Sequence, residues 1–167
     1  MDLQFIQIEQ HLLNATYWNY DLYNTEEYKD NWNLENFSLL GPNRIARHED
    51  IVARVYTRYS SGEPVLLFFD LKTKYGGVIL KSPIVEAPTI IYIPHKIHYN
   101  PTFKVWATSN RFEWDNENQL LSWWPDKNEP SNQIIITPVV HDLDSSNLPE
   151  MAKNLISKTT FSTELPV

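Results

Sequence analysis

A series of short apolar or alternating runs fills the chain after Gly62, and this series restricts the fold more than any other feature. Turn residues separate the runs, as at Asn100-Pro101 and Ser109-Asn110. In "FKVWA", alternate residues share one face at the strand period of two. Seven such strands predict an antiparallel β-sandwich over residues 61–140. The runs are "PVLLFFDL", "GVILK", "PTIIYIP", "TFKVWAT", "RFEWD", "QLLSWW" and "QIIITPVV".

The first 60 residues have a different pattern. Leu3–Leu13 places apolar residues on one side of a short predicted helix, and Ala15–Tyr20 has the composition of a strand. Apolar residues then recur at helical spacing over Asp50–Tyr59, which predicts a second helix. The expected order is helix, strand, loop, helix. One such unit of a parallel α/β structure cannot bury its strand alone.

The residues after the predicted sandwich are polar and mixed. The stretch "LPEMAKNLISK" predicts one short helix, and the last residues have the composition of a loose tail. We therefore divide the chain into residues 1–60, a sandwich over 61–140, and a tail over 141–167.

Composition excludes several classes of function. The net charge of −7 argues against nucleic acid or an anionic membrane as the main partner, because both select basic surfaces. The absence of cysteine excludes disulfides and thiolate metal sites. No stretch has the length of a membrane span, and the start of the chain lacks the pattern of a signal peptide. We expect no cofactor, and the compartment stays open.

The segment Tyr17–Leu40, "YWNYDLYNTEEYKDNWNLENFSLL", is too polar for a core and too aromatic for an ordinary loop. It resembles the segment after the last barrel strand in the endoglycoceramidase-like branch of glycoside hydrolase family 5. That branch has a W-N-Y motif followed by roughly Y-G-D-x-W-N-G-E-D-L-S. The departures are Lys29 and Leu34, where the family prefers Gly, and Asn36 in place of Asp. The matching residues are Trp18, Asn19, Tyr20, Tyr28, Asp30, Trp32, Asn33, Glu35 and Ser38.

The resemblance implies a mainly β chain, in which residues 1–60 are the remnant of a (β/α)₈ barrel and the sandwich is a C-terminal domain. Arg58-Tyr59 is similar to the end of the family's closing helix. In the family, the acid/base and nucleophile glutamates lie on earlier strands, and nothing here corresponds to them. We therefore expect a fragment of a retaining glycosidase that is not catalytic alone. Its partners would be the rest of the barrel and a carbohydrate or glycolipid substrate.

The resemblance also implies binding residues. Trp18 would stack on the sugar next to the scissile bond, since an indole ring offers apolar area to the C–H face of a sugar. Sugar hydroxyls would be contacted from the loop by Asn19, Tyr20, Asp30, Trp32 and Glu35. The alternative, which we favour for Asp30, is that polar residues of this loop make local Asx turns. Asp30 and Glu35 are poorly placed for a catalytic pair, because such pairs need rigid positions.

Two other groups are weaker candidates. His95 and His98 would face opposite sides of a strand, which argues against a metal site. Trp114, Trp123 and Trp124 offer a surface for sugars, although aromatics at alternate strand positions more often form a core. Three functions therefore stay open: an accessory domain of a glycosidase, a free-standing carbohydrate-binding module, and a structural β domain.

Overall fold

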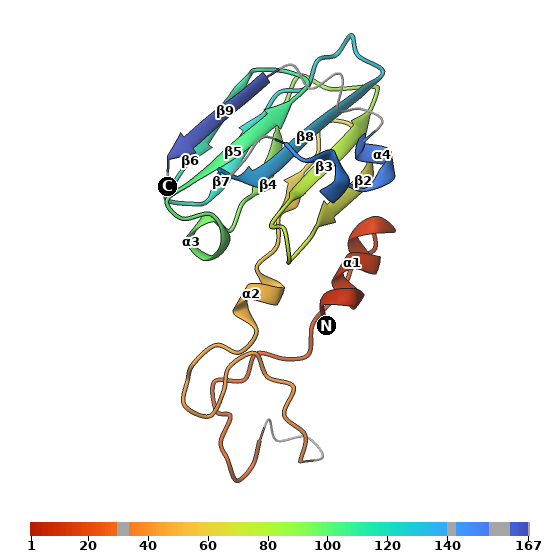
Figure 1. Cartoon of the computed structure of the whole chain (residues 1–167). Helices are drawn as coiled ribbons and strands as arrows, with labels where there is room; N and C mark the ends of the chain where they lie inside the picture. Colours follow the sequence, from red (N-terminus) through yellow and green to blue (C-terminus); the bar gives the residue numbers. More distant parts are fainter. Residues whose placement is uncertain (30–33, 140–142, 154–160, 167) are drawn as a thin grey trace.

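The computed structural model describes residues 1–29, 34–139, 143–153 and 161–166. Nine strands form two antiparallel sheets within these ranges (Figure 1). One sheet has the order β1-β4-β7-β6 and the other β2-β3-β8-β5-β9. The strands are β1 (Tyr56–Tyr59), β2 (Glu63–Phe69), β3 (Gly76–Lys81), β4 (Thr89–Tyr92), β5 (Thr102–Ala107), β6 (Phe112–Asp115), β7 (Leu120–Trp123), β8 (Ser131–Pro138) and β9 (Phe161–Pro166).

The main core lies between the two sheets. Phe103, Val105 and Ala107 are all fully buried on the inner face of β5, as their period of two predicts. A second, smaller core covers the outer face of the five-stranded sheet, where Leu148 and Ala152 pack on β2, β3 and β8. Ala152 belongs to α4 (Glu150–Lys153), which follows the short 3₁₀ turn η1 (Ser145–Asn147). The predicted sandwich is confirmed, and all seven expected runs contain strands.

The structure first differs from the prediction at Ala15–Tyr20, which does not form a strand. In the described part of residues 1–55 there are helices and two isolated bridges, but no strand. The backbone of residues 15–20 has no neighbouring strand with which to form a ladder, and a single strand is not stable without one.

The predicted helix over Asp50–Tyr59 is also wrong over most of its length. The helix α2 covers only Glu49–Val52, and Tyr56–Tyr59 is strand β1, paired with β4. Val55 is fully buried in the sandwich core. The β propensity of "VYTRY" and the pairing partner at β4 outweigh the helical spacing. The sandwich therefore begins before residue 61.

The end of the chain differs from a loose tail. Strand β9 pairs with β5 along its whole length and forms an edge of the five-stranded sheet. The short helix predicted for this region begins at Glu150, as α4.

Helix α1 (Asp2–Gln10) packs beside β2 at the edge of the sandwich (Figure 1). Between α1 and α2 the chain leaves the sandwich and returns, so residues 14–29 and 34–48 extend away from it (Figure 1). We call residues 14–48 the arm. Within the described ranges, each helix is too short or too polar to cross a membrane.

Candidate functional site

The interior of the arm is polar. Asn24 and Ser38 are buried, and Asn24 exchanges amide hydrogen bonds with Asn36 at 2.6 and 3.2 Å. The Arg47 guanidinium donates to Asn36 Oδ1 at 2.7 Å and, through Nε, to Ser38 O at 3.0 Å. Ser38 Oγ accepts from the backbone N–H groups of Asp21 and Leu40. Among the described residues of the arm, these polar contacts join its two sides, and Leu40 is buried beside them.

Most aromatic and aliphatic side chains of the arm face outward, whereas Leu40 is buried. Of the large apolar side chains that are exposed in the described residues, only Val85, Ile97 and Met151 lie outside residues 1–59. Polar groups buried beneath exposed aromatic and aliphatic side chains depart from the usual order of a soluble protein, and exposed Glu26, Glu27 and Glu35 share this surface. A concentration of exposed apolar groups of this kind marks a surface that another molecule covers. On the arm these side chains are Tyr17, Trp18, Tyr20, Leu22, Tyr23, Tyr28, Leu34, Phe37 and Ile45.

The structure places three of the four predicted binding residues at the start of the arm. Trp18 is 62% exposed and Tyr20 is also exposed. Asn19 holds the backbone, because its carbonyl accepts the Leu39 N–H at 2.9 Å, while its side-chain Oδ1 is buried without a hydrogen bond among the described residues. The Trp18–Asn19 peptide bond is cis. Trp32, like Asp30, lies outside the described residues.

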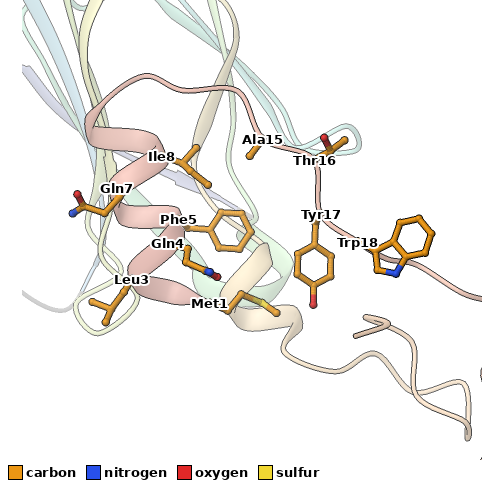
Figure 2. A pocket seen from close by; sticks show the side chains of 10 residues that line it. All are labelled: Met1, Leu3, Gln4, Phe5, Gln7, Ile8, Ala15, Thr16, Tyr17 and Trp18. Carbon is orange, nitrogen blue, oxygen red and sulfur yellow. The ribbon is translucent and has the colours of Figure 1, made fainter. Parts of the chain in front are cut away.

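An apolar groove of about 720 Å³ lies between α1 and the start of the arm (Figure 2). Phe5 and Ile8 line it from the helix, and Tyr17 and Trp18 line it from the arm. Figure 2 shows the ring of Trp18 directed away from α1. Tyr17 is fixed by its hydroxyl, which donates to Phe37 O at 2.8 Å. The structure therefore does not bury these rings in a core of the arm.

The two positions where the resembling family prefers glycine have left-handed backbone angles. Lys29 has φ of 55° and Leu34 has φ of 61°. Only glycine takes this conformation without steric cost. The backbone here thus has the shape that glycine would favour, although this chain has larger residues.

This geometry gives a testable prediction for Leu34, which is 80% exposed. We expect Leu34→Gly to stabilise the arm by about 0.5 kcal/mol, because relief of the left-handed strain exceeds the extra entropy of unfolded glycine. Hydrogen exchange at the Leu39 amide should slow by about two-fold, because about 0.5 kcal/mol of added stability lowers the population of the open form by that factor. Leu22→Gly is the matched control, at an exposed position outside the left-handed positions. It should make exchange faster; slower exchange in both variants would contradict the explanation.

The weaker candidates have structural roles. His95 and His98 lie on one helical turn, α3 (His95–His98), instead of a strand. Their Nε2 atoms contact different carbonyls, Asn116 O at 3.1 Å and Ala53 O at 2.7 Å. Burial lowers the pKa of both imidazoles, which favours their neutral forms. Among the described residues, no group of three or more potential ligands is placed to hold a metal ion.

The tryptophans of the sandwich do not form one exposed face. Trp123 is fully buried, and its Nε1–H donates to Ser109 Oγ at 2.8 Å. Trp114 packs partly buried against the core, with its ring edge-on to Phe103. Trp124 lies beneath the guanidinium of Arg111, 4.5 Å from ring centre to Cζ. Glu35 is exposed on the arm.

Comparisons with known proteins concern the chain and its fold. No family model matches the chain. A glucosylceramidase from Rhizopus delemar is 28% identical over 171 residues, which are 88% of this chain and 25% of that protein. The chain resembles the C-terminal part of an endoglycoceramidase-like family 5 glycosidase. It spans about a quarter of the length of the relative that it matches.

Two solved structures have the same fold. Sterylglucosidase 1 of Cryptococcus neoformans superposes with a TM-score of 0.73 at 21% identity, over 86% of this chain and 25% of that one. Endoglycoceramidase II from Rhodococcus sp. superposes with a TM-score of 0.63 at 15% identity, over 83% of this chain and 29% of that one. These likenesses show the fold, and they cover 86% and 83% of the chain, which is more than the sandwich strands alone.

Sequence reasoning missed the polar residues that hold the arm. The motif includes Ser38 and departs at Asn36, but it does not indicate that either residue contacts Asn24 or Arg47. A signal was present, since an arginine close to a cluster of Asn and Ser in a segment poor in aliphatic residues needs acceptors of its own. These four residues fix the backbone that carries Trp18, Asn19 and Tyr20.

Proposed function

We propose that this chain is the C-terminal part of a retaining glycoside hydrolase that cleaves glucose from a lipid aglycone. Residues 1–55 would complete the last unit of its catalytic barrel, and the sandwich would support that unit. The single observation that carries the proposal is the reversed arm, with polar groups inside and aromatic groups outside. A surface of this kind needs a partner, and three quarters of the glucosylceramidase relative has no counterpart here.

Within the assembled enzyme, each residue at the start of the arm has a distinct role. The Trp18 ring would lie under the apolar face of the glucose next to the bond that breaks. Asn19 and Tyr20 would donate or accept hydrogen bonds at its hydroxyls, and Trp32 would add a second wall. The acid/base and nucleophile carboxylates would come from the rest of the parent. The glucosylceramidase and sterylglucosidase names favour a glucosylated lipid as the substrate class.

A chimera tests the proposal. The Rhizopus delemar glucosylceramidase would receive this chain in place of the region that aligns with it, and hydrolysis of a fluorescent glucosylceramide would be measured. We expect Trp18→Ala to lower kcat/KM by about 100-fold, roughly 2.7 kcal/mol of transition-state stabilisation. Tyr59→Ala is the matched control, because Tyr59 is similarly exposed but lies on β1. It should change kcat/KM by less than about two-fold.

The isolated chain separates this function from a free-standing carbohydrate-binding module. We expect neither hydrolysis of aryl β-glucosides nor binding of glucosides at millimolar concentration by calorimetry, because most of the site is supplied by the parent. Micromolar binding that Trp18→Ala abolishes would support the binding module. Hydrolysis that Glu35→Gln abolishes would contradict the expectation that the chain is not catalytic alone.

A further inference from the structure

One buried arginine connects α1, the end of the arm and the sandwich. Arg54 is only 4% exposed, and its guanidinium meets three residues of α1. Nη1 donates to Asp2 Oδ1 at 2.8 Å, and Nε and Nη2 form a two-point contact with the Glu9 carboxylate. The Phe5 ring covers the guanidinium at 5.4 Å. Asp2, Phe5 and Glu9 are three and four residues apart, so they lie on one face of the helix.

The same arginine is bonded to the edge of the five-stranded sheet. Nη2 of Arg54 donates to Phe69 O at 2.7 Å, and the Phe69 N–H donates to Glu9 Oε2 at 3.1 Å. Phe69 is the last residue of β2, the outermost strand on that side. Its ring lies 5.0 Å from Arg54 Cζ, so the guanidinium is held between the rings of Phe5 and Phe69. Both main-chain polar groups of Phe69 are satisfied by this cluster.

The two ends of the arm meet at this cluster. Helix α1 precedes the arm, and Arg54 follows α2, where the arm returns to the sandwich. The neighbouring Ala53 carbonyl is held by His98 Nε2 at 2.7 Å, and the His98 ring lies 5.1 Å from that of Phe69. We call Asp2, Phe5, Glu9, Arg54 and Phe69 the clamp.

We propose that Arg54 is a positioning residue: through the clamp it fixes both ends of the arm to β2 and so sets where Trp18 stands relative to the sandwich. The catalytic consequence rests on the proposed function, whereas the structural one does not. Arg54 itself lies in the clamp and not among the groove residues beside Trp18. Its effect on a bound sugar would therefore pass through the arm.

The charges of the clamp make Arg54 irreplaceable by other residues. Burial raises the pKa of Glu9, and Arg54 opposes this by hydrogen bonding and by its charge. Without Arg54 the Glu9 and Asp2 carboxylates would face each other beside two aromatic rings, and of the groups that lower the pKa of Glu9 only the Phe69 N–H would remain against burial. Lysine keeps the charge but cannot present a planar fork to several acceptors at once. Arg54→Lys should therefore weaken the clamp without reversing its charge.

Hydrogen exchange on the full chain tests the structural part. We expect Arg54→Met and Arg54→Lys to speed exchange in residues 2–13 and 49–55 by about 10-fold or more, while β3, β5 and β8 keep their protection. Arg58→Met is the matched control, since Arg58 is exposed on β1 only four residues away, and it should leave both regions unchanged. If Arg54→Met does not fold, Glu9→Gln keeps the shape of the side chain and should release α1 in the same way. Unchanged protection of α1 in the folded variants would overturn the proposal.

A double-mutant cycle in the chimera tests whether Arg54 acts through Trp18. Arg54→Lys should lower kcat/KM about 10-fold at a temperature where the protein stays folded. In a Trp18→Ala background the same change should have almost no further effect, because the residue that it positions is gone. Full additivity of the two changes would reduce Arg54 to a stabilising residue and overturn the positioning role. If Trp18→Ala alone left kcat/KM unchanged, the proposed function would fail. The hydrogen-exchange result would still test whether Arg54 fixes both ends of the arm.

Discussion

Replacement of Trp123 by alanine is expected to remove about 3–5 kcal/mol from the free energy of unfolding. Trp123 is 0% exposed in β7, which lies between β4 and β6, and it belongs to the core between the two sheets. The substitution would leave a cavity and would remove the hydrogen bond that the indole N–H donates to Ser109 Oγ. Because domains of this kind are stable by only about 5–15 kcal/mol, much of the total would be lost.

Urea denaturation followed by circular dichroism measures this effect. At a slope of about 2 kcal/mol per molar urea, the midpoint should fall by roughly 2 M. Trp18→Ala in the same chain is the matched control, and it should cost less than about 0.5 kcal/mol because the Trp18 ring is largely exposed. Similar losses at both positions would mean that the Trp18 ring belongs to a core of the arm, contrary to the structure.

The sandwich could be predicted because most of its strands have a recognisable local sequence pattern. In β5 the alternation of Phe103, Val105 and Ala107 with half-buried residues is a local pattern, and the structure buries that face. Strand β1 has no such pattern: Tyr56 and Tyr59 are exposed, and the strand exists because it pairs with β4, about thirty residues later. Strand β9 likewise depends on its pairing with β5.

The candidate site also has a local sequence signal. The W-N-Y motif points to Trp18, Asn19 and Tyr20, and their role in binding stays a prediction; the structure shows that Trp18 and Tyr20 are exposed at the start of the arm. The strand predicted around them does not form, because a strand needs a neighbour to pair with, and residues 15–20 pair with no strand in the described part of the chain. The sequence analysis does not predict the clamp. Its only local signal is that Asp2 and Glu9 share a helix face with Phe5, an arrangement that favours a buried cation between them.

The largest expected effect concerns the protection of the arm. In the isolated chain we expect backbone amides of residues 14–48 to exchange at least about 100-fold faster than those of β3 and β8. The sandwich amides are paired inside a sheet and lie over a core, so their exchange requires opening near the global free energy. The Leu39 and Gly41 amides also donate hydrogen bonds, both of 2.9 Å. They belong to a segment that polar side chains hold together and whose aromatic side chains are exposed.

Hydrogen exchange with mass spectrometry would resolve the two regions in one experiment. The comparison of Leu39 and Gly41 with Val78 and Ile134 controls for hydrogen bonding, since all four amides belong to bonded segments and differ in what covers them. In the chimera the arm should become protected while β3 and β8 change little, because the parent would cover the aromatic exterior. Equal protection of arm and sandwich in the isolated chain would show a complete fold over residues 1–55. The aromatic groups of the arm would then need no partner, and the glycosidase fragment would lose its main support.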